Sequence, residues 1–173
     1  RDRRLLARVR DRRDYDERPH HTLRFNYKLT DFQAALGRSQ FRRLPAMLSR
    51  RVAIATRYQR QWANLPIRLP PSSRGRSHVY HRFVIGIPSS TGAVARRLRE
   101  FGIIARPPVY RPIHLTLRMD GFPGATHAFQ HALSVPVYPA LTSQEVDQVI
   151  RAIQRVFACL LYTSPSPRDR TRS

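Results

Sequence analysis

Two histidines stand four residues apart in the segment HAFQH, at His127 and His131. On a helix this spacing places both imidazoles on one face, as in helices that bind zinc. The segment lacks the glutamate of the H-E-x-x-H motif, and the sequence suggests no third ligand. We therefore predict no metal site and interpret both histidines as residues of a helix surface. His20 and His21 lie in a charged stretch, and we assign them no role.

Lys28 is the only lysine among the 173 residues. Schiff-base chemistry needs a primary amine on a side chain. Chemistry of this kind must therefore use Lys28 or a lysine outside this sequence. The sequence has no G-x-S-x-G nucleophile elbow, no Walker loop for phosphates and no dinucleotide-binding G-x-G-x-x-G.

The chain is strongly basic, with a formal net charge of +21. Clustered cations bind nucleic acids through their phosphates. Here the cations are spread along the chain, and acidic residues are mixed into the arginine-rich segment 1–24. All but one of the 32 cationic side chains are arginine, which also fits a coding bias toward G and C. We expect no nucleic-acid partner and keep binding to a polyanion as a minor alternative.

Both ends of the sequence are unusual. The first residue is Arg1 rather than Met, so we expect the natural protein to continue upstream. Residues Cys159 to Asp169 resemble a translated sequencing-library adapter, and we expect 159–173 not to be native. The only cysteine lies in this tail, which leaves no disulfide or thiolate site. We see no signal peptide and no apolar run near the ~20 residues of a membrane helix, so we expect a cytoplasmic protein without a membrane partner.

The longest periodic segment runs from Thr30 to about Trp62 and predicts a helix, because apolar residues recur every three or four positions. Thr30 and Asp31 are candidate N-caps. Pro45 lies inside, so we expect a kink or a junction between two helices there. The predicted buried stripe comprises Phe41, Leu44, Leu48, Val52, Ala55, Tyr58 and Trp62.

The rest of the sequence predicts alternating strands and helices, an α/β arrangement with the sheet covered mainly from one side. Thr142 and Glu145 form a T-x-x-E capping box at the start of the last helix, and Gly102 stands where a helix ends. The expected elements are strand 79–87, helix 91–101, strand 103–106, a proline-stiffened loop 107–124, helix 126–133, strand 135–137 and a final helix. The buried face of that final helix comprises Val146, Val149, Ile150, Ile153 and Phe157.

Residues 24–44, RFNYKLTDFQAALGRSQFRRL, carry a more specific pattern. They resemble the signature N-x-R-x-T-D-x-Q-A-A-x-x-x-x-Q-x-x-x-L of the DegT/DnrJ/StrS-type nucleotide-sugar aminotransferases, which depend on pyridoxal 5′-phosphate (PLP). The matching residues are Asn26, Thr30, Asp31, Gln33, Ala34, Ala35, Gln40 and Leu44. Segments SHVYHRFVI, LREFGIIARPPVYRPIH and LSVPVYPALTSQEVDQVIRAI are also similar to the family, so the likeness covers about Leu5 to Phe157.

The resemblance implies an α/β fold, namely the C-terminal part of a fold-type I PLP aminotransferase. Residues 1–29 would be the end of the large PLP-binding domain and a dimer-facing loop, 30–65 a long interdomain helix, and 66–158 a small domain with a short sheet packed on helices. The family's Schiff-base lysine precedes such a segment. We therefore expect no catalytic residue in this chain.

The function implied is transfer of an amino group, usually from glutamate, to a keto sugar on a nucleotide, in a homodimer with PLP. Asn26 matches an asparagine that donates to the PLP phosphate of the other subunit, although it could also open the helix as an Asx-turn. Lys28 matches an arginine facing the partner's active site, or is a surface lysine. Tyr110 and His114 match a loop that lines the sugar-nucleotide pocket, or pack on the small domain.

Two departures from the family pattern stand out. Arg24 occupies a position where the family often has glycine, the residue that permits close backbone approach. The run PPVYRP at 107–112 replaces a commoner His-Tyr-Pro and leaves the substrate pocket unassigned. The alternative function is a non-catalytic relative that keeps the fold for sensing or regulation, because a fold alone does not fix an activity.

Overall fold

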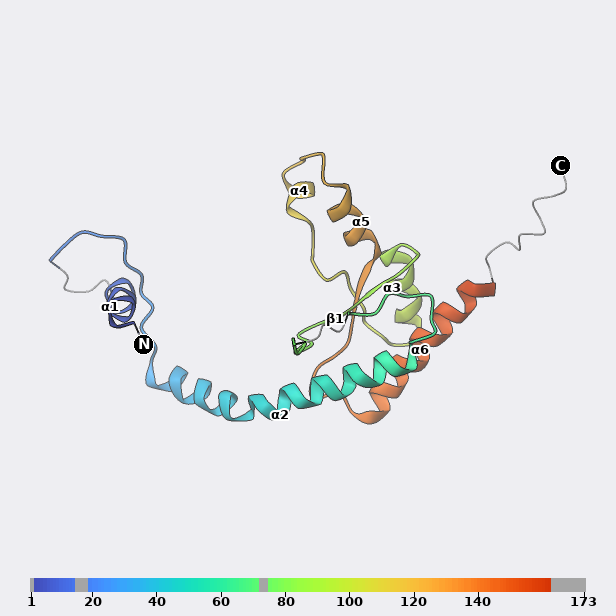
Figure 1. The fold of residues 1–173 in the computed structure, drawn as a ribbon, viewed down its shortest axis with the longest axis horizontal. Coiled ribbons are helices and arrows are strands. Elements are labelled where there is room, and N and C mark those ends of the chain that lie inside the picture. The colour runs from blue at the N-terminus through green and yellow to red at the C-terminus, as the bar shows by residue number, and fades with distance from the viewer. Residues whose placement is uncertain (1, 15–18, 72–74, 163–173) are drawn as a thin grey trace. The chain divides into compact units, whose positions relative to one another are not determined.

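The computed structural model describes residues 2–14, 19–71 and 75–162. Its Cα positions divide the chain into two compact units, Arg1–Leu44 and Pro45–Ser173. Figure 1 shows the order of the elements along the chain. Most of the tail expected at 159–173 lies outside the described residues, and the backbone of 159–162 belongs to the last helix.

The first unit begins with helix α1, Arg3–Arg12, which Asp2 caps by accepting the backbone N–H groups of Arg4 and Leu5 at 2.9 and 3.1 Å. An extended segment then leads to helix α2. Thr30 caps α2 as predicted: its hydroxyl accepts the N–H of Gln33 at 3.3 Å, while the Gln33 side chain accepts the Thr30 N–H at 3.0 Å. This reciprocal pair satisfies two donors that a helix start leaves unbonded.

Helix α2, Asp31–Gln61, is continuous, so the junction of two helices considered at Pro45 is not found. Proline removes one N–H group, but the flanking turns keep their helical conformation. The predicted stripe is buried only in its C-terminal part, at Ala55, Tyr58 and Trp62. Phe41 is 74% exposed. The apolar face of α2 therefore belongs to the core only within the second unit.

The sheet of the second unit pairs strand β1, Phe83–Gly86, with strand β2, Ala132–Val135, in antiparallel register from Phe83 opposite Val135 to Gly86 opposite Ala132. Each outer edge gains one isolated bridge, from Arg68 to Gly86 and from Arg106 to Ser134. The small sheet therefore has two paired strands and two single-bridge neighbours.

The predicted strand 79–87 is too long, because residues 79–80 are irregular and 81–82 form a bend. Tyr80 has a φ of 46°, and its N–H donates to Nδ1 of His78 at 2.9 Å. The Arg51 guanidinium donates to the carbonyls of Tyr80 and His81, at 3.2 and 3.0 Å. Both side-chain bonds keep this backbone out of a strand ladder.

Two other strand predictions were also wrong in extent. Residues 103–106 contribute only the bridge at Arg106, because the Ile103 N–H already bonds the Leu98 carbonyl at the end of a helix. The strand expected at 135–137 lies at 132–135 instead. Pro136 has no N–H group and ends the ladder.

The helices of the second unit follow their terminal signals. Ser90 caps helix α3, Thr91–Glu100, and Gly102 follows it with a φ of 74°. The capping box of helix α6, Ser143–Tyr162, is confirmed, because the Glu145 carboxylate accepts the Thr142 N–H at 2.7 Å. The expected loop 107–124 contains the short helix α4, Ile113–Thr116, and the start of helix α5, Pro123–His131. Helix α5 starts three residues before the predicted position, with Pro123 in its first turn.

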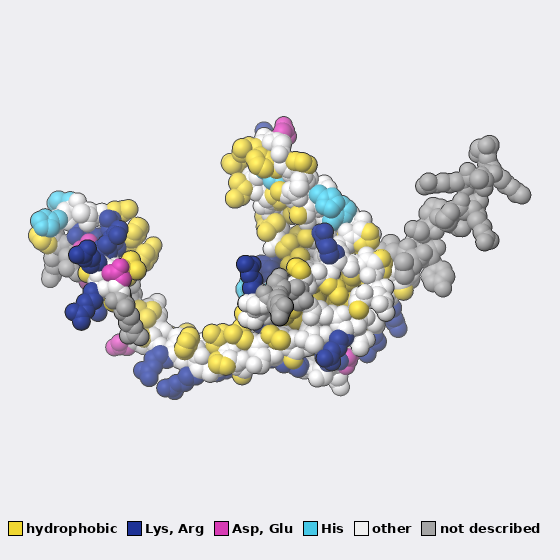
Figure 2. Space-filling model, in the orientation of Figure 1, with side chains coloured by type: hydrophobic (Ala, Val, Ile, Leu, Met, Phe, Trp, Pro, Cys, Tyr) yellow, Lys and Arg dark blue, Asp and Glu magenta, His cyan; other side chains and the backbone are white. Residues whose placement is uncertain are grey.

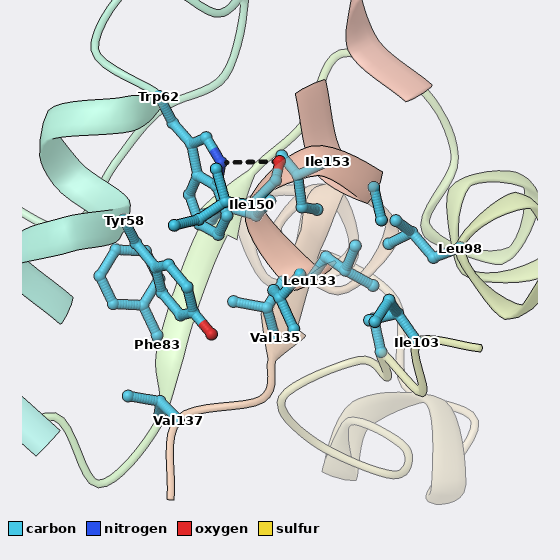
Figure 3. Packing of buried hydrophobic residues seen from close by; sticks show 14 of the residues in the cluster. Tyr58, Trp62, Phe83, Leu98, Ile103, Leu133, Val135, Val137, Ile150 and Ile153 are labelled. Atoms are coloured by element: carbon cyan, nitrogen blue, oxygen red, sulfur yellow. Dashed lines mark hydrogen bonds between the residues drawn. The ribbon is translucent and has the colours of Figure 1, made fainter. Parts of the chain in front are cut away.

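The core of the second unit forms where α2, the sheet and α6 meet (Figure 3). Phe83 and Ile85 of β1 and Leu133 of β2 are fully buried, as the alternation along a half-buried strand requires. All five predicted core positions of α6 are buried: Val146, Val149, Ile150, Ile153 and Phe157. This core holds the base of the loop that carries Tyr110 and His114.

Candidate functional site

The predicted cofactor ligand Asn26 lies in an extended segment that follows α1. The N–H groups of Phe25 and Tyr27 donate to the carbonyls of Arg12 and Arg13 at 2.8 and 3.0 Å. These carbonyls end α1 and would otherwise lack partners. The backbone is therefore fixed on both sides of Asn26, whose own side chain is exposed.

Two ion pairs tie this segment to the residues before it. The Lys28 ammonium lies 3.3 Å from the Asp14 carboxylate. Arg24 donates through Nε and Nη2 to one Asp11 oxygen, at 3.1 and 2.9 Å, and its side chain is only 9% exposed. Arg24, at a position where the family often has glycine, thus bonds Asp11 within its own unit. The sequence predicted neither acidic partner.

An apolar groove of about 530 Å³ lies on the first unit beside the start of α2. Leu29 and Phe41 line it together with the small residues Ala34 and Gly37. Phe32 on the same helix is 79% exposed. Large exposed apolar side chains of this kind mark surfaces that another protein surface covers.

Tyr110 and His114 both belong to the second unit, but their environments differ. Tyr110 is 99% exposed, in the bend between Pro108 and Pro112. His114, in α4, is only 9% exposed and packs against Phe122 with ring centroids 5.4 Å apart. Figure 2 shows hydrophobic side chains gathered over this α4–α5 segment. The loop therefore offers one exposed phenol and one nearly buried imidazole.

Thr126 supports His114 through a hydrogen bond. His114 Nε2 lies 2.9 Å from the Thr126 hydroxyl, which is also 3.2 Å from the Phe122 carbonyl. A hydroxyl has one hydrogen to donate, so when that hydrogen goes to Phe122, His114 Nε2 is the donor to Thr126. Sequence reasoning missed Thr126, because nothing in the pattern pairs two residues twelve positions apart.

A hollow of about 340 Å³ lies beside this histidine. Its polar lining includes His114, Asp120, Thr126, His127 and Gln130. An imidazole acceptor can take a hydrogen bond from a sugar hydroxyl, and the protonated ring can donate to a phosphate. The hollow therefore has groups suited to a polar, hydroxyl-rich ligand.

His127 and His131 lie on one helix face, as their spacing predicts, with ring centroids 4.4 Å apart. His131 Nδ1 is 3.2 Å from the Ile87 carbonyl and donates to it. Across residues 2–14, 19–71 and 75–162, no three His, Cys, Asp or Glu side chains are grouped to hold a metal ion. None of the helices in these ranges has the length and apolar character needed to cross a lipid bilayer.

Comparison with known proteins decides the family. The sequence pattern that defines the DegT/DnrJ/EryC1/StrS aminotransferase family matches residues 3–154. The chain belongs to this family. The resemblance seen in residues 24–44 and in the later segments is thereby confirmed over almost the whole described chain.

Two relatives of this chain have names that refer to sugar or polysaccharide metabolism. The chain is 35% identical over 133 residues to the dTDP-4-dehydro-2,3,6-trideoxy-D-glucose 4-aminotransferase of Saccharopolyspora spinosa, an alignment covering 72% of this chain and 34% of that protein. It is 29% identical over 147 residues to the spore coat polysaccharide biosynthesis protein SpsC of Bacillus subtilis, covering 76% and 38%. The chain therefore spans well under half the length of these relatives.

Solved structures confirm the predicted fold. The aminotransferase TlmJ from Streptoalloteichus hindustanus superposes with a TM-score of 0.81 at 28% identity, covering 92% of this chain and 47% of TlmJ. DesV of S. venezuelae, solved with a ketimine intermediate, gives a TM-score of 0.79 at 27% identity, covering 89% and 44%. The chain is α/β, with a long helix and a short sheet packed on helices, and corresponds to part of the fold of these aminotransferases.

Proposed function

We propose that the whole protein containing this chain is a PLP-dependent aminotransferase that transfers an amino group, usually from glutamate, to a keto sugar linked to a nucleotide. The observation that carries the proposal is the family match over residues 3–154. A relative named for such a reaction is the UDP-N-acetyl-3-dehydro-alpha-D-glucosamine 3-aminotransferase of Acidithiobacillus ferrooxidans, 27% identical over 159 residues. When bound, PLP supplies an electron sink for the carbon that loses or gains the amino group.

Asn26 is proposed to hold the PLP phosphate of the other subunit in a homodimer. Its amide is a neutral donor that suits a phosphate oxygen. Its side chain is exposed, and the bonds of Phe25 and Tyr27 to α1 fix the backbone that carries it. A donor held in this way loses little conformational entropy when it binds. The residues present therefore fit a phosphate-bearing cofactor.

Lys28 is proposed to contact substrate in the partner's site rather than to form the Schiff base. Its side chain already forms an ion pair with Asp14 at 3.3 Å, and a protonated amine is not a nucleophile. The Schiff-base amine would then come from a lysine of the whole protein that this sequence does not contain.

Tyr110 and His114 are proposed to line the sugar-nucleotide pocket in different ways. The fully exposed phenol of Tyr110 can reach a phosphate or a sugar hydroxyl directly. His114 is held by Thr126 and lines the adjoining hollow. The first residue would contact the nucleotide sugar, and the second would shape the pocket wall.

The division of the chain follows from the same proposal. Residues 1–29 would complete the large PLP-binding domain and the dimer loop, 30–65 form the interdomain helix, and 66–158 form the small domain. The apolar groove lined by Leu29 and Phe41 would then be covered by the rest of the whole protein or by its second subunit. We place this enzyme in the cytoplasm, where nucleotide sugars are made.

A direct test uses the full-length protein purified with PLP. It is incubated with glutamate and a set of dTDP-, UDP- and GDP-linked keto sugars, while 2-oxoglutarate and the mass of the sugar product are followed. We expect 2-oxoglutarate and aminosugar to form in equal amounts with at least one substrate. PLP binding without turnover on any keto sugar would favour the sensing or regulatory relative, and failure to bind PLP would refute the proposal.

A further inference from the structure

Arg82 makes a contact that neither the sequence pattern nor the proposed function assigns. It directly precedes β1, and its Nη1 donates to the Pro108 carbonyl at 2.7 Å. Pro108 opens the exposed bend that carries Tyr110. A guanidinium bond to a carbonyl is charge-assisted and therefore stronger than a bond between two neutral groups.

The bend has few other attachments. The backbone pairing of Arg106 with Ser134 ends before it, and the next backbone bond is from the Thr116 N–H to the Pro112 carbonyl. Within the described ranges, the Arg82 contact is the hydrogen bond that joins residues 107–110 to the rest of the unit. Pro107 and Pro108 lack N–H groups, so a carbonyl is the backbone group they can offer to an anchor.

The exposure of the bend explains why an anchor matters. Tyr110 is 99% exposed, so packing does not hold its side chain, and Val109 is 51% exposed. The prolines limit the backbone torsions but do not attach the bend to the sheet. The Arg82 bond at the base of the bend, together with the half-buried Pro107 and Pro108, therefore restricts the directions in which Tyr110 can project.

We propose that Arg82 is a positioning residue. By bonding the Pro108 carbonyl, it holds the bend 108–111 so that Tyr110 is placed to contact substrate. The effect on substrate binding rests on the proposed function, whereas the bond between Arg82 and Pro108 is observed in this chain. Without the bond, the loop would remain attached at Arg106 and at α4 and would sample other orientations in between. Substrate binding would weaken, while the reacting groups would be unchanged.

The rate of chymotrypsin cleavage measures how firmly the Arg82 bond holds the bend, because this protease cuts after exposed aromatic residues. In the 173-residue chain, Tyr110 and Tyr27 are exposed and Trp62 is fully buried. We expect Arg82→Met to raise the cleavage rate after Tyr110 by about fivefold, as the loss of one charged hydrogen bond predicts. Cleavage after Tyr27 and Trp62 should not change, and Arg82→Lys should give an intermediate rate.

The matched control is Arg97→Met, which removes an exposed arginine from α3. It should leave all three cleavage rates at the wild-type value. An unchanged rate after Tyr110 in Arg82→Met would overturn the proposal. So would an equal rise after Trp62, because that pattern reports a general loss of stability rather than a freed loop.

The second arm uses the full-length enzyme. Arg82→Met should raise the KM for the nucleotide keto sugar several-fold and leave kcat and the KM for glutamate near the wild-type values. An unchanged sugar KM would overturn the positioning role. A wild-type protein without aminotransferase activity would refute the proposed function instead, and the proteolysis would still decide whether Arg82 anchors the loop.

Discussion

The indole of Trp62 stacks on the phenol ring of Tyr58, with centroids 4.4 Å apart and both side chains fully buried (Figure 3). The polar end of each ring reaches a backbone carbonyl: Trp62 Nε1 donates to Ile150 at 3.4 Å, and the Tyr58 hydroxyl donates to Pro136 at 2.9 Å. The pair therefore joins α2 to α6 and to the segment after β2. Burial raises the pKa of Tyr58, because the phenolate would be desolvated.

Replacing Trp62 by alanine should destabilise the second unit more than any surface change. The cavity and the lost packing predict a loss of about 3–5 kcal/mol in the free energy of unfolding. Urea denaturation followed by circular dichroism measures it. Ile104→Ala is the control in the same unit, since that side chain is 60% exposed and its loss should cost about 0.5 kcal/mol or less. Equal effects of the two changes would contradict the assignment of the core.

The start of α6 should be sensitive to acid through Glu145. The N–H and hydroxyl of Thr142 donate to its carboxylate and lower its pKa below the ordinary value. A lowered pKa adds stability above the unfolded-state value near ~4.3, and this stability is lost as the pH falls through the folded-state pKa. We expect Glu145→Gln to reduce the fall in stability between about pH 5 and pH 2, measured by denaturation at each pH. A Glu145→Gln profile that follows the wild type would contradict this prediction, because the capping box would then contribute nothing that depends on its charge.

Three helix ends were predictable from sequence because their signals are local, whereas the short α4 and the start of α5 were not predicted. The T-x-x-E box at Thr142, the glycine after α3 and the threonine before α2 each act within four residues. The strand ends were not predictable, because distant groups decide them. Arg51 of α2 donates to the Tyr80 carbonyl, although the two residues are 29 positions apart in the sequence. No local pattern predicts that contact.

The candidate site shows the same difference between features set by local sequence and features set by distant residues. The family signature identified Asn26 and Lys28 by type and spacing, and the loop resemblance identified Tyr110 and His114. Their supports lie at distant positions: Thr126 bonds His114, and Arg82 bonds the base of the Tyr110 bend. Sequence reasoning therefore found candidate ligands but not the residues that position them.

Two glycines should respond in opposite ways to alanine. Gly102 has a φ of 74°, which an alanine adopts only with strain, so Gly102→Ala should cost about 1 kcal/mol in the free energy of unfolding. Gly37 lies inside α2 with no atom within 4 Å of an added Cβ, so Gly37→Ala should raise helix stability by about 0.5–1 kcal/mol. Thermal unfolding of the two variants measures the difference, and a shift of the same sign for both would contradict it.

Thr126→Val should show how much the hydrogen bond between Thr126 and His114 contributes to the free energy of unfolding. Valine keeps the shape of threonine but leaves the imidazole Nε2 without its hydrogen-bond partner, at a cost of about 1–3 kcal/mol. Urea denaturation measures the loss. Thr116→Val is the control, since its hydroxyl bonds only the Pro112 carbonyl one turn earlier in an exposed position. A smaller loss for Thr126 than for Thr116 would show that the His114 bond adds nothing to stability.

The proposed role of Asn26 predicts a defect that appears in the other subunit. Asn26→Ala in the full-length protein removes one donor to a charged phosphate, so PLP should bind about 10- to 100-fold more weakly. Asn26→Asp should weaken binding further, because it adds a negative charge beside the phosphate. PLP absorbance during equilibrium dialysis measures both values, with the exposed Asn64→Ala as control.

Mixed dimers then separate binding across the interface from binding within one subunit. A dimer with one Asn26→Ala subunit should keep one tight PLP site and lose one, whichever arrangement holds. The arrangement is decided by a second change that removes the Schiff-base lysine from one subunit only. If Asn26 acts on the other subunit, a dimer with both changes in the same subunit loses both PLP sites. If that dimer keeps one tight site, Asn26 holds the cofactor of its own subunit and the proposal is wrong.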